Sequence, residues 1–110
     1  SSESSGAVQF SGTGGAADFA SGAIRAKNGR GIVAFTSTAK KGTMSKIKCL
    51  LTPGSAVTIH RNLADTIVTE YGIAELKGLS VPERARALIS IAHPDFREQL
   101  TEEAKQIGFI

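Results

Sequence analysis

Short runs of β-branched and apolar residues alternate with stretches of helical periodicity along this chain. Five runs are typical of strands, since such residues pack well on a pleated surface; they cover residues 7–10, 31–35, 46–51, 56–59 and 66–69. Helical spacing of apolar residues over 16–24 separates the first two runs, and Asn28-Gly29 is the expected stop. Strands that alternate with helices predict an α/β domain, in which we find no internal repeat.

Two longer helices are expected near the C-terminus. Ser80 and Glu83 have the spacing of a capping box, and the helix that follows is expected to run to residue 92. The His93-Pro94-Asp95 segment breaks this helix and begins another, which ends before Gly108. The apolar faces of both helices are expected to cover the sheet, or a partner domain.

Three further segments carry specific expectations. The 31–35 run has no polar alternation, which predicts a parallel strand buried on both faces by helices. The polar stretch 36–45 predicts an exposed loop, and residues 73–76 predict one short helical turn that ends at Gly78.

The length of 110 residues suits one compact domain and is too short for two. Residues 1–6 contain only Ser, Glu and Gly, so we expect a flexible lead-in there and a single domain over 7–110. No apolar run approaches the roughly 20 residues of a membrane span, and the polar N-terminus does not resemble a secretion signal. The single cysteine, Cys49, fits a reducing compartment, which predicts a cytoplasmic protein without a membrane partner.

The charge pattern argues against nucleic acid as a partner. The net charge is +3, but Lys and Arg form no cluster, and aromatic residues make up only 5% of the chain. A surface on which bases stack is therefore hard to assemble, and a modest positive field equally suits a phosphate-bearing small molecule.

Gly12, Gly14 and Gly15 lie between the first predicted strand and the first predicted helix. Glycines allow a ligand to approach the backbone, and a helix N-terminus presents N–H groups to an anion or a carbonyl oxygen. The third glycine of the dinucleotide-binding pattern is replaced by Ala17, and no Gly-Lys-Ser/Thr sequence follows. The spacing leaves a tight structural turn and a ligand-facing turn both open.

Lys40, Lys41 and Glu70 are the charged candidates. The two lysines follow a predicted strand, where α/β sheets place ligand contacts, although they equally suit a solvated loop. Glu70 ends a β-type run, where a partly buried carboxylate acts as a base, as a nucleophile, or as a structural partner of Arg61 or of a backbone amide.

The remaining chemically active side chains indicate no site. His60, His93 and Cys49 share no metal-ligand spacing, so we expect both histidines to be structural or exposed and no metal to be bound. Cys49 lies in an apolar run, which favours packing over reactivity, and the chain contains no Gly-x-Ser-x-Gly sequence of a hydrolase.

Four segments, in this order and at these distances, carry a resemblance: FSGTGGAADF (10–19), STAKKGTMSKI (37–47), VTEYGIAELKG (68–78) and AHPDFR (92–97). Over nearly all of residues 7–104 the chain resembles the C-terminal domain of the acetyl-CoA hydrolase/transferase family, especially its 4-hydroxybutyrate and butyrate:acetate coenzyme A-transferases. The resemblance implies a Rossmann-like α/β fold of the coenzyme A-transferase type, with a mostly parallel sheet flanked by helices.

The resemblance also implies a reaction. Such enzymes move coenzyme A between an acyl-CoA and a small carboxylate, through an acyl anhydride and then a glutamyl-CoA thioester on one glutamate, with no tightly bound cofactor. That glutamate lies in a His-Thr-Glu-Met-like string upstream of the matched segment, and these 110 residues contain no such string. We therefore expect a fragment that lacks an N-terminal domain, is inactive alone, and belongs to a homo-oligomer.

The family's site residues carry over to four positions. The resemblance implies that Gly14 and Gly15 form the substrate turn, and that the amide of Gly15 donates to the thioester carbonyl oxygen. It implies a coenzyme A contact for Lys40, with Lys41 as the alternative, and it places Ser11 at the same pocket. The alternative functions are an acyl-CoA hydrolase of the same family and a non-catalytic domain that binds an acyl-CoA or a partner.

Overall fold

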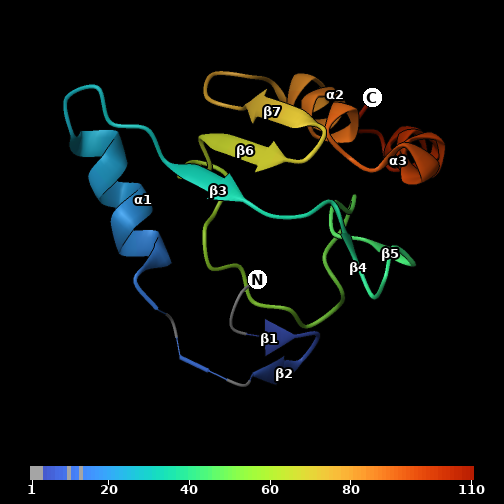
Figure 1. The fold of residues 1–110 in the computed structure, drawn as a ribbon, viewed down its shortest axis with the longest axis horizontal. Coiled ribbons are helices and arrows are strands. Elements are labelled where there is room, and N and C mark those ends of the chain that lie inside the picture. Colours follow the sequence, from blue (N-terminus) through green and yellow to red (C-terminus); the bar gives the residue numbers. More distant parts are fainter. Residues whose placement is uncertain (1–3, 10, 13) are drawn as a thin grey trace.

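The computed structural model describes residues 4–9, 11–12 and 14–110. Strands occupy the N-terminal two thirds of this part, together with one helix, and two helices close it (Figure 1). The elements are β1 (Ser4–Ser5), β2 (Val8–Gln9), α1 (Ala16–Arg25), β3 (Ile32–Ala34), β4 (Thr38–Ala39), β5 (Met44–Ser45), β6 (Thr66–Thr69), β7 (Gly72–Glu75), α2 (Val81–Ser90) and α3 (Pro94–Gln106).

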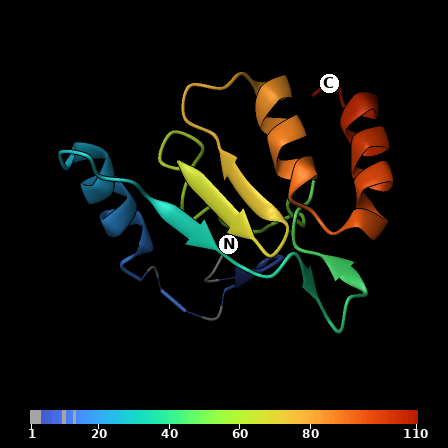
Figure 2. The same cartoon turned by 45° about the horizontal axis from the view of Figure 1, so that its top comes forward.

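A three-stranded sheet with the order β3-β6-β7 organises the fold. β3 runs parallel to β6, with Val33 opposite Ile67, and β7 returns antiparallel to β6, with Ala74 opposite Ile67. The predicted α/β class is confirmed, and the sheet that the helices flank is mixed (Figure 2).

β7 replaces the helical turn that the sequence predicted over residues 73–76. The backbone pairs Thr69 with Gly72, so Glu70 and Tyr71 alone form the turn of a tight hairpin. Gly72 has φ +146°, a conformation that side chains rarely adopt, and it sends the chain back along β6. Ile73 is then exposed and Ala74 buried, which is the two-residue period of a strand.

The two C-terminal helices form as predicted. The Ser80 hydroxyl accepts a hydrogen bond from the Glu83 backbone N–H, and the Glu83 carboxylate accepts one from the Ser80 backbone N–H. The His93 side chain caps α3, and Gly108 follows this helix with φ +83°. α2 packs against β7 and α3 packs against α2, around a core of Ile47, Ile67, Ala74, Leu76, Ile91, Ala92 and Leu100.

Two predicted strands, 46–51 and 56–59, are irregular in the structure. In the first, Ile47 and Cys49 join the core and lie beside Phe96 and Leu100 of α3. In the second, Val57 is 60% exposed. A β-type run becomes a strand only where another strand pairs with it, and neither segment has such a neighbour among the described strands.

The segment around β3 corrects two further expectations. Ile32 and Ala34 are exposed, so β3 is parallel as predicted but is covered on only one face. Residues 36–45 form the hairpin of β4 and β5 rather than an irregular loop, and Ser37 and Ser45 within this stretch are buried.

α1 forms as predicted, and the N-terminal region contains a small hairpin. β2 lies within the strand predicted over 7–10, whose Phe10 falls outside the described residues. Its partner is β1, so Ser4 and Ser5 of the expected lead-in are paired, while residues 1–3 also fall outside the described part. Among the described residues, we find no helix with the length and apolarity to cross a membrane.

Candidate functional site

Gly15 is the N-cap of α1 and is exposed to solvent. Its φ and ψ are −83° and 0°, its carbonyl accepts the N–H of Phe19 at 2.9 Å, and as a glycine it has no side chain to cap the helix. The first N–H groups of a helix have no acceptor within it and carry the positive end of its dipole. This end of α1 can therefore donate to a carbonyl oxygen or to an anion.

The residues before the cap leave this end accessible. Gly12 and Gly14 are exposed, and a Cβ added at either position would meet no atom within 4 Å. Ser11 is also exposed, and its backbone carbonyl accepts a hydrogen bond from the Gln9 side chain at 2.6 Å. Ser11, Gly14 and Gly15 are thus all accessible, and Thr13 between them lies outside the described residues.

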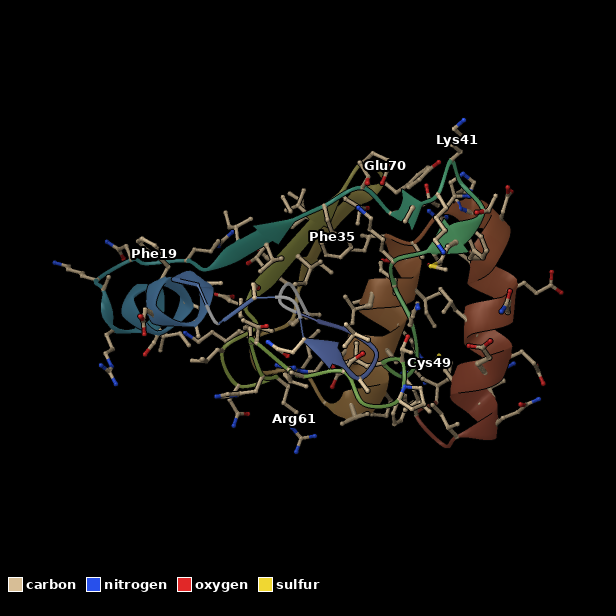
Figure 3. The ribbon with its side chains drawn as sticks, turned by 90° about the horizontal axis from the view of Figure 1, so that it is seen from below. Phe19, Phe35, Lys41, Cys49, Arg61 and Glu70 are labelled. Atoms are coloured by element: carbon tan, nitrogen blue, oxygen red, sulfur yellow. The ribbon has the colours of Figure 1, made fainter. Side chains whose placement is uncertain are left out.

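Lys40 lies at the tip of the β4–β5 hairpin. Lys40, Lys41 and Gly42 have φ of +50°, +56° and +84°, three successive left-handed residues that turn the chain sharply. Thr43 fastens the turn, because its backbone N–H and its hydroxyl both donate to the Lys40 carbonyl, at 3.2 and 2.7 Å. Both lysines are exposed, and Figure 3 shows Lys41 projecting outward from the tip.

Glu70 holds the base of this hairpin. Its Oε1 accepts a hydrogen bond from the backbone N–H of Ser37 at 2.7 Å, and this bond is the main cause that lowers the pKa of the carboxyl. Of the roles that the sequence left open, the structural partner of a backbone amide is the one that the structure shows. The alternative partner, Arg61, lies on the opposite side of the molecule (Figure 3).

An aromatic cluster beside Glu70 was not singled out from the sequence. The His93 ring packs edge-on against Tyr71 and Phe96, with centroids 5.5 and 6.2 Å apart, and the Arg97 guanidinium lies 5.5 Å from the centre of the Tyr71 ring. The AHPDFR string contains His93, Phe96 and Arg97 of this cluster, but its spacing indicates only a helix boundary and a family motif. His93 is structural, as expected, and His60 is exposed.

Cys49 borders a cavity of about 520 Å³ between residues 43–50 and α3. Its thiol donates to the Leu100 carbonyl at 3.4 Å, and burial, followed by the nearby Glu103 carboxylate, raises its pKa. A thiol of raised pKa is a weak nucleophile, as the sequence indicated. Within the described ranges, no three His, Cys, Asp or Glu side chains are grouped as metal ligands.

The predicted site residues occupy two separate places. The glycine turn precedes α1 at one end of the long axis, and the lysine hairpin lies toward the other end, in a molecule of 37 × 32 × 26 Å (Figures 1 and 2). The structure therefore groups Ser11, Gly14 and Gly15, but it does not bring Lys40 beside them.

The fold is that of an α/β domain whose first long helix, α1, has an accessible, glycine-flanked N-terminus. The family model described as the acetyl-CoA hydrolase/transferase C-terminal domain matches residues 1–104. The chain belongs to this family.

Individual relatives support the same family assignment. The chain is 55% identical over 105 residues to the 4-hydroxybutyrate coenzyme A transferase of Clostridium kluyveri, covering 96% of this chain and 24% of that protein. It is 50% identical over 109 residues to the succinyl-CoA:cyclohexane-1-carboxylate CoA transferase of Geobacter metallireducens, covering 99% and 25%. The crystal structure of RipA from Yersinia pestis superimposes with a TM-score of 0.91 at 47% identity, covering 99% and 24%. The chain thus spans about a quarter of the length of the relatives it matches.

Proposed function

We propose that this chain is the C-terminal part of a coenzyme A-transferase that moves coenzyme A between an acyl-CoA and a carboxylic acid such as acetate, butyrate or 4-hydroxybutyrate. The observation that carries the proposal is the accessible N-terminus of α1, whose N-cap is Gly15 and which follows Gly14, in a chain 55% identical to a 4-hydroxybutyrate coenzyme A transferase. We also expect a cytoplasmic protein, since its single thiol fits a reducing compartment.

The proposed reaction has two covalent stages on a glutamate that precedes this chain in the full-length protein. The carboxylate attacks the thioester carbonyl and expels the coenzyme A thiolate, which leaves an acyl anhydride. The thiolate then attacks the glutamyl carbonyl of the anhydride, so a glutamyl-CoA thioester forms and the first carboxylate departs. The second carboxylate reverses these stages and leaves as the new acyl-CoA.

This chain contributes fixed groups to that reaction. Each attack places negative charge on a carbonyl oxygen, and in the proposed reaction the Gly15 N–H, at the positive end of α1, stabilises this charge. Gly14 and Ser11 keep the approach open, and Lys40 supplies positive charge for the phosphates of coenzyme A. Because Lys40 lies far from the glycine turn, the proposal requires the extended coenzyme A molecule, or the remainder of the protein, to connect the two places.

The test uses the full-length protein with acetyl-CoA and 4-hydroxybutyrate. We expect 4-hydroxybutyryl-CoA as the product, and a protein adduct that adds the mass of coenzyme A less one water and that hydroxylamine removes. Release of free coenzyme A without a carboxylate acceptor identifies the hydrolase instead, an activity that the family description includes. If neither the product nor the adduct forms, the proposed catalysis is contradicted. Calorimetry of acetyl-CoA and butyryl-CoA with the chain then tests whether it is a purely binding domain.

A further inference from the structure

The cavity of about 520 Å³ between residues 43–50 and α3 lies directly beside the lysine hairpin. Thr43 and Met44 line it and follow residues 40–42 without a break, so the hairpin tip continues into the cavity wall. The cavity opens to solvent, since Leu50 on its border is 65% exposed. We call this cavity the α3 groove.

Apolar and polarisable side chains form part of the groove wall. Met44, Phe96 and Leu100 all line it. A methionine sulfur packs favourably against an aromatic ring, and a phenyl ring does so edge-on or in an offset stack. These walls therefore suit a flat aromatic ring of a ligand.

One face of α3 adds polar groups to the groove. Gln99, Glu103 and Gln106 line it, at the helical spacing that places side chains on one face. The Gln99 side-chain amide donates to the Glu103 carboxylate at 3.0 Å, which holds these two groups side by side. Glutamine amides pair with the amino group and ring nitrogen at the edge of adenine, and a carboxylate accepts from an amino group. The groove thus combines apolar walls with groups that recognise a purine.

Positive charge gathers where the groove meets the hairpin. Lys48 lines the groove, and the exposed Lys40 and Lys41 form the hairpin tip beside it. Against the single carboxylate of Glu103 on the groove wall, three lysines leave the local balance of charge positive. This balance suits a ring that carries phosphate groups better than it suits an apolar protein segment.

The order of groups in coenzyme A matches the order of these features. In acyl-CoA the thioester is followed by the pantetheine arm, the pyrophosphate, and an adenosine that carries a 3′-phosphate. The proposed function assigns the thioester to Gly15 and the phosphates to Lys40. In the structure α1, the β4–β5 hairpin and α3 follow one another along the molecule (Figures 1 and 2). An adenosine that continues past Lys40, away from Gly15, reaches the α3 groove.

We propose that the α3 groove binds the 3′-phosphorylated adenosine end of coenzyme A, with the base against Met44 and Phe96 and the 3′-phosphate toward Lys48. This inference rests on the proposed function in that an acyl-CoA is the substrate, and it adds the place where the nucleotide is held. Binding energy from this remote part of the substrate is then available to position the thioester for reaction.

Cys49 borders the groove and reports its occupancy in the full-length protein. Iodoacetamide labelling of this half-buried thiol is followed by peptide mass spectrometry, with adenosine 3′,5′-bisphosphate or pantetheine as the added compound. We expect saturating bisphosphate to slow the labelling at least about fivefold and pantetheine to change it less than about twofold, because only the nucleotide limits access to the thiol.

Two results of this labelling would overturn the proposal. The first is an equal labelling rate with and without the bisphosphate. The second is a Cys49 that reacts only after denaturation, since another part of the protein or a second copy would then cover the groove.

Two neighbouring leucines give matched variants of the full-length protein. Leu50 lines the groove and Leu51 does not, and they are 65% and 49% exposed. Leu50→Asp places a carboxylate beside the bound nucleotide, so we expect KM for acetyl-CoA to rise about tenfold, whereas Leu51→Asp should change it less than about twofold. S-acetylpantetheine, which lacks the nucleotide, should react equally well with wild type and with both variants. An equal effect of the two substitutions on acetyl-CoA, or the same loss with S-acetylpantetheine, would contradict a nucleotide site in the groove.

The nucleotide site and the proposed function fail separately. Coenzyme A transfer without protection of Cys49 would overturn the nucleotide site and leave the transferase reaction in place. Protection of Cys49 without transfer would support the nucleotide site and contradict the proposed reaction.

Discussion

The Glu70 carboxylate accepts the backbone N–H of Ser37 at 2.7 Å, and this bond joins the end of β6 to the base of the lysine hairpin. The two residues are 33 positions apart, so the bond sets a tertiary relationship rather than a local turn. The hairpin is further held by Lys46, whose backbone N–H donates to the Ser37 carbonyl at 2.8 Å. The placement of Lys40 thus depends on a carboxylate that is not itself a nucleophile in the proposed reaction.

Glu70→Gln should loosen this hairpin and make the folding stability less dependent on pH in the acid range. The hydrogen bond from Ser37 lowers the pKa of Glu70 below its ordinary value of 4.5, so the folded state favours the charged carboxylate. Its stabilising contribution is present above pH 4.5 and is lost as the pH falls through the lowered pKa. Thermal melts should therefore show wild type more stable than Glu70→Gln at neutral pH, with the gap closing in acid. A gap that is constant with pH would contradict this role.

Gly15→Ala should affect catalysis more than folding. A Cβ at Gly15 would lie 3.1 Å from the Phe19 ring, but this ring is 82% exposed and can move, and φ at Gly15 is −83°. We expect a change in unfolding free energy below about 1 kcal/mol and a fall of about tenfold or more in kcat for the full-length protein, because the methyl group crowds the donor. Gly22→Ala, in the same helix, is the matched control: it should raise helix stability by about 0.5–1 kcal/mol and leave kcat unchanged.

Lys40→Ala and Lys41→Ala decide which lysine binds coenzyme A. Loss of one phosphate contact should raise KM for the acyl-CoA about tenfold at low salt, and less at high salt, because screening weakens the interaction. We expect this effect at Lys40 and little change at Lys41. The reverse order would assign the contact to Lys41, and no change in either variant would leave the hairpin outside the site.

Leu100→Ala should destabilise the domain strongly. Leu100 is 5% exposed and packs in the core between α3 and Ile47, so truncation leaves a cavity. The expected loss is about 2–4 kcal/mol by urea denaturation of the full-length protein. Leu50→Ala removes the same atoms at a side chain that is 65% exposed and should cost less than about 1 kcal/mol. Equal losses would show that the remainder of the protein buries Leu50.

The helices could be predicted from the sequence because their signals are local. The Ser80 and Glu83 pair, the Pro94 start and the Gly108 end act through neighbours a few residues away, and each occurs in the structure as expected. The glycine turn before α1 was also visible in the sequence for this reason. Residues 46–51 show the limit, since the same apolar pattern suits a strand and an irregular segment that packs on α3.

The sequence by itself determined the family, the three helices and the two places that carry the candidate site residues, because these depend on residue types and short spacings. Only the tertiary structure decided which β-type runs became strands, that residues 72–75 return along β6, and that Glu70 binds the amide of Ser37. A strand requires a partner distant in the chain, and a carboxylate requires a donor brought to it by folding. Long-range pairing of this kind leaves no fixed spacing in the sequence.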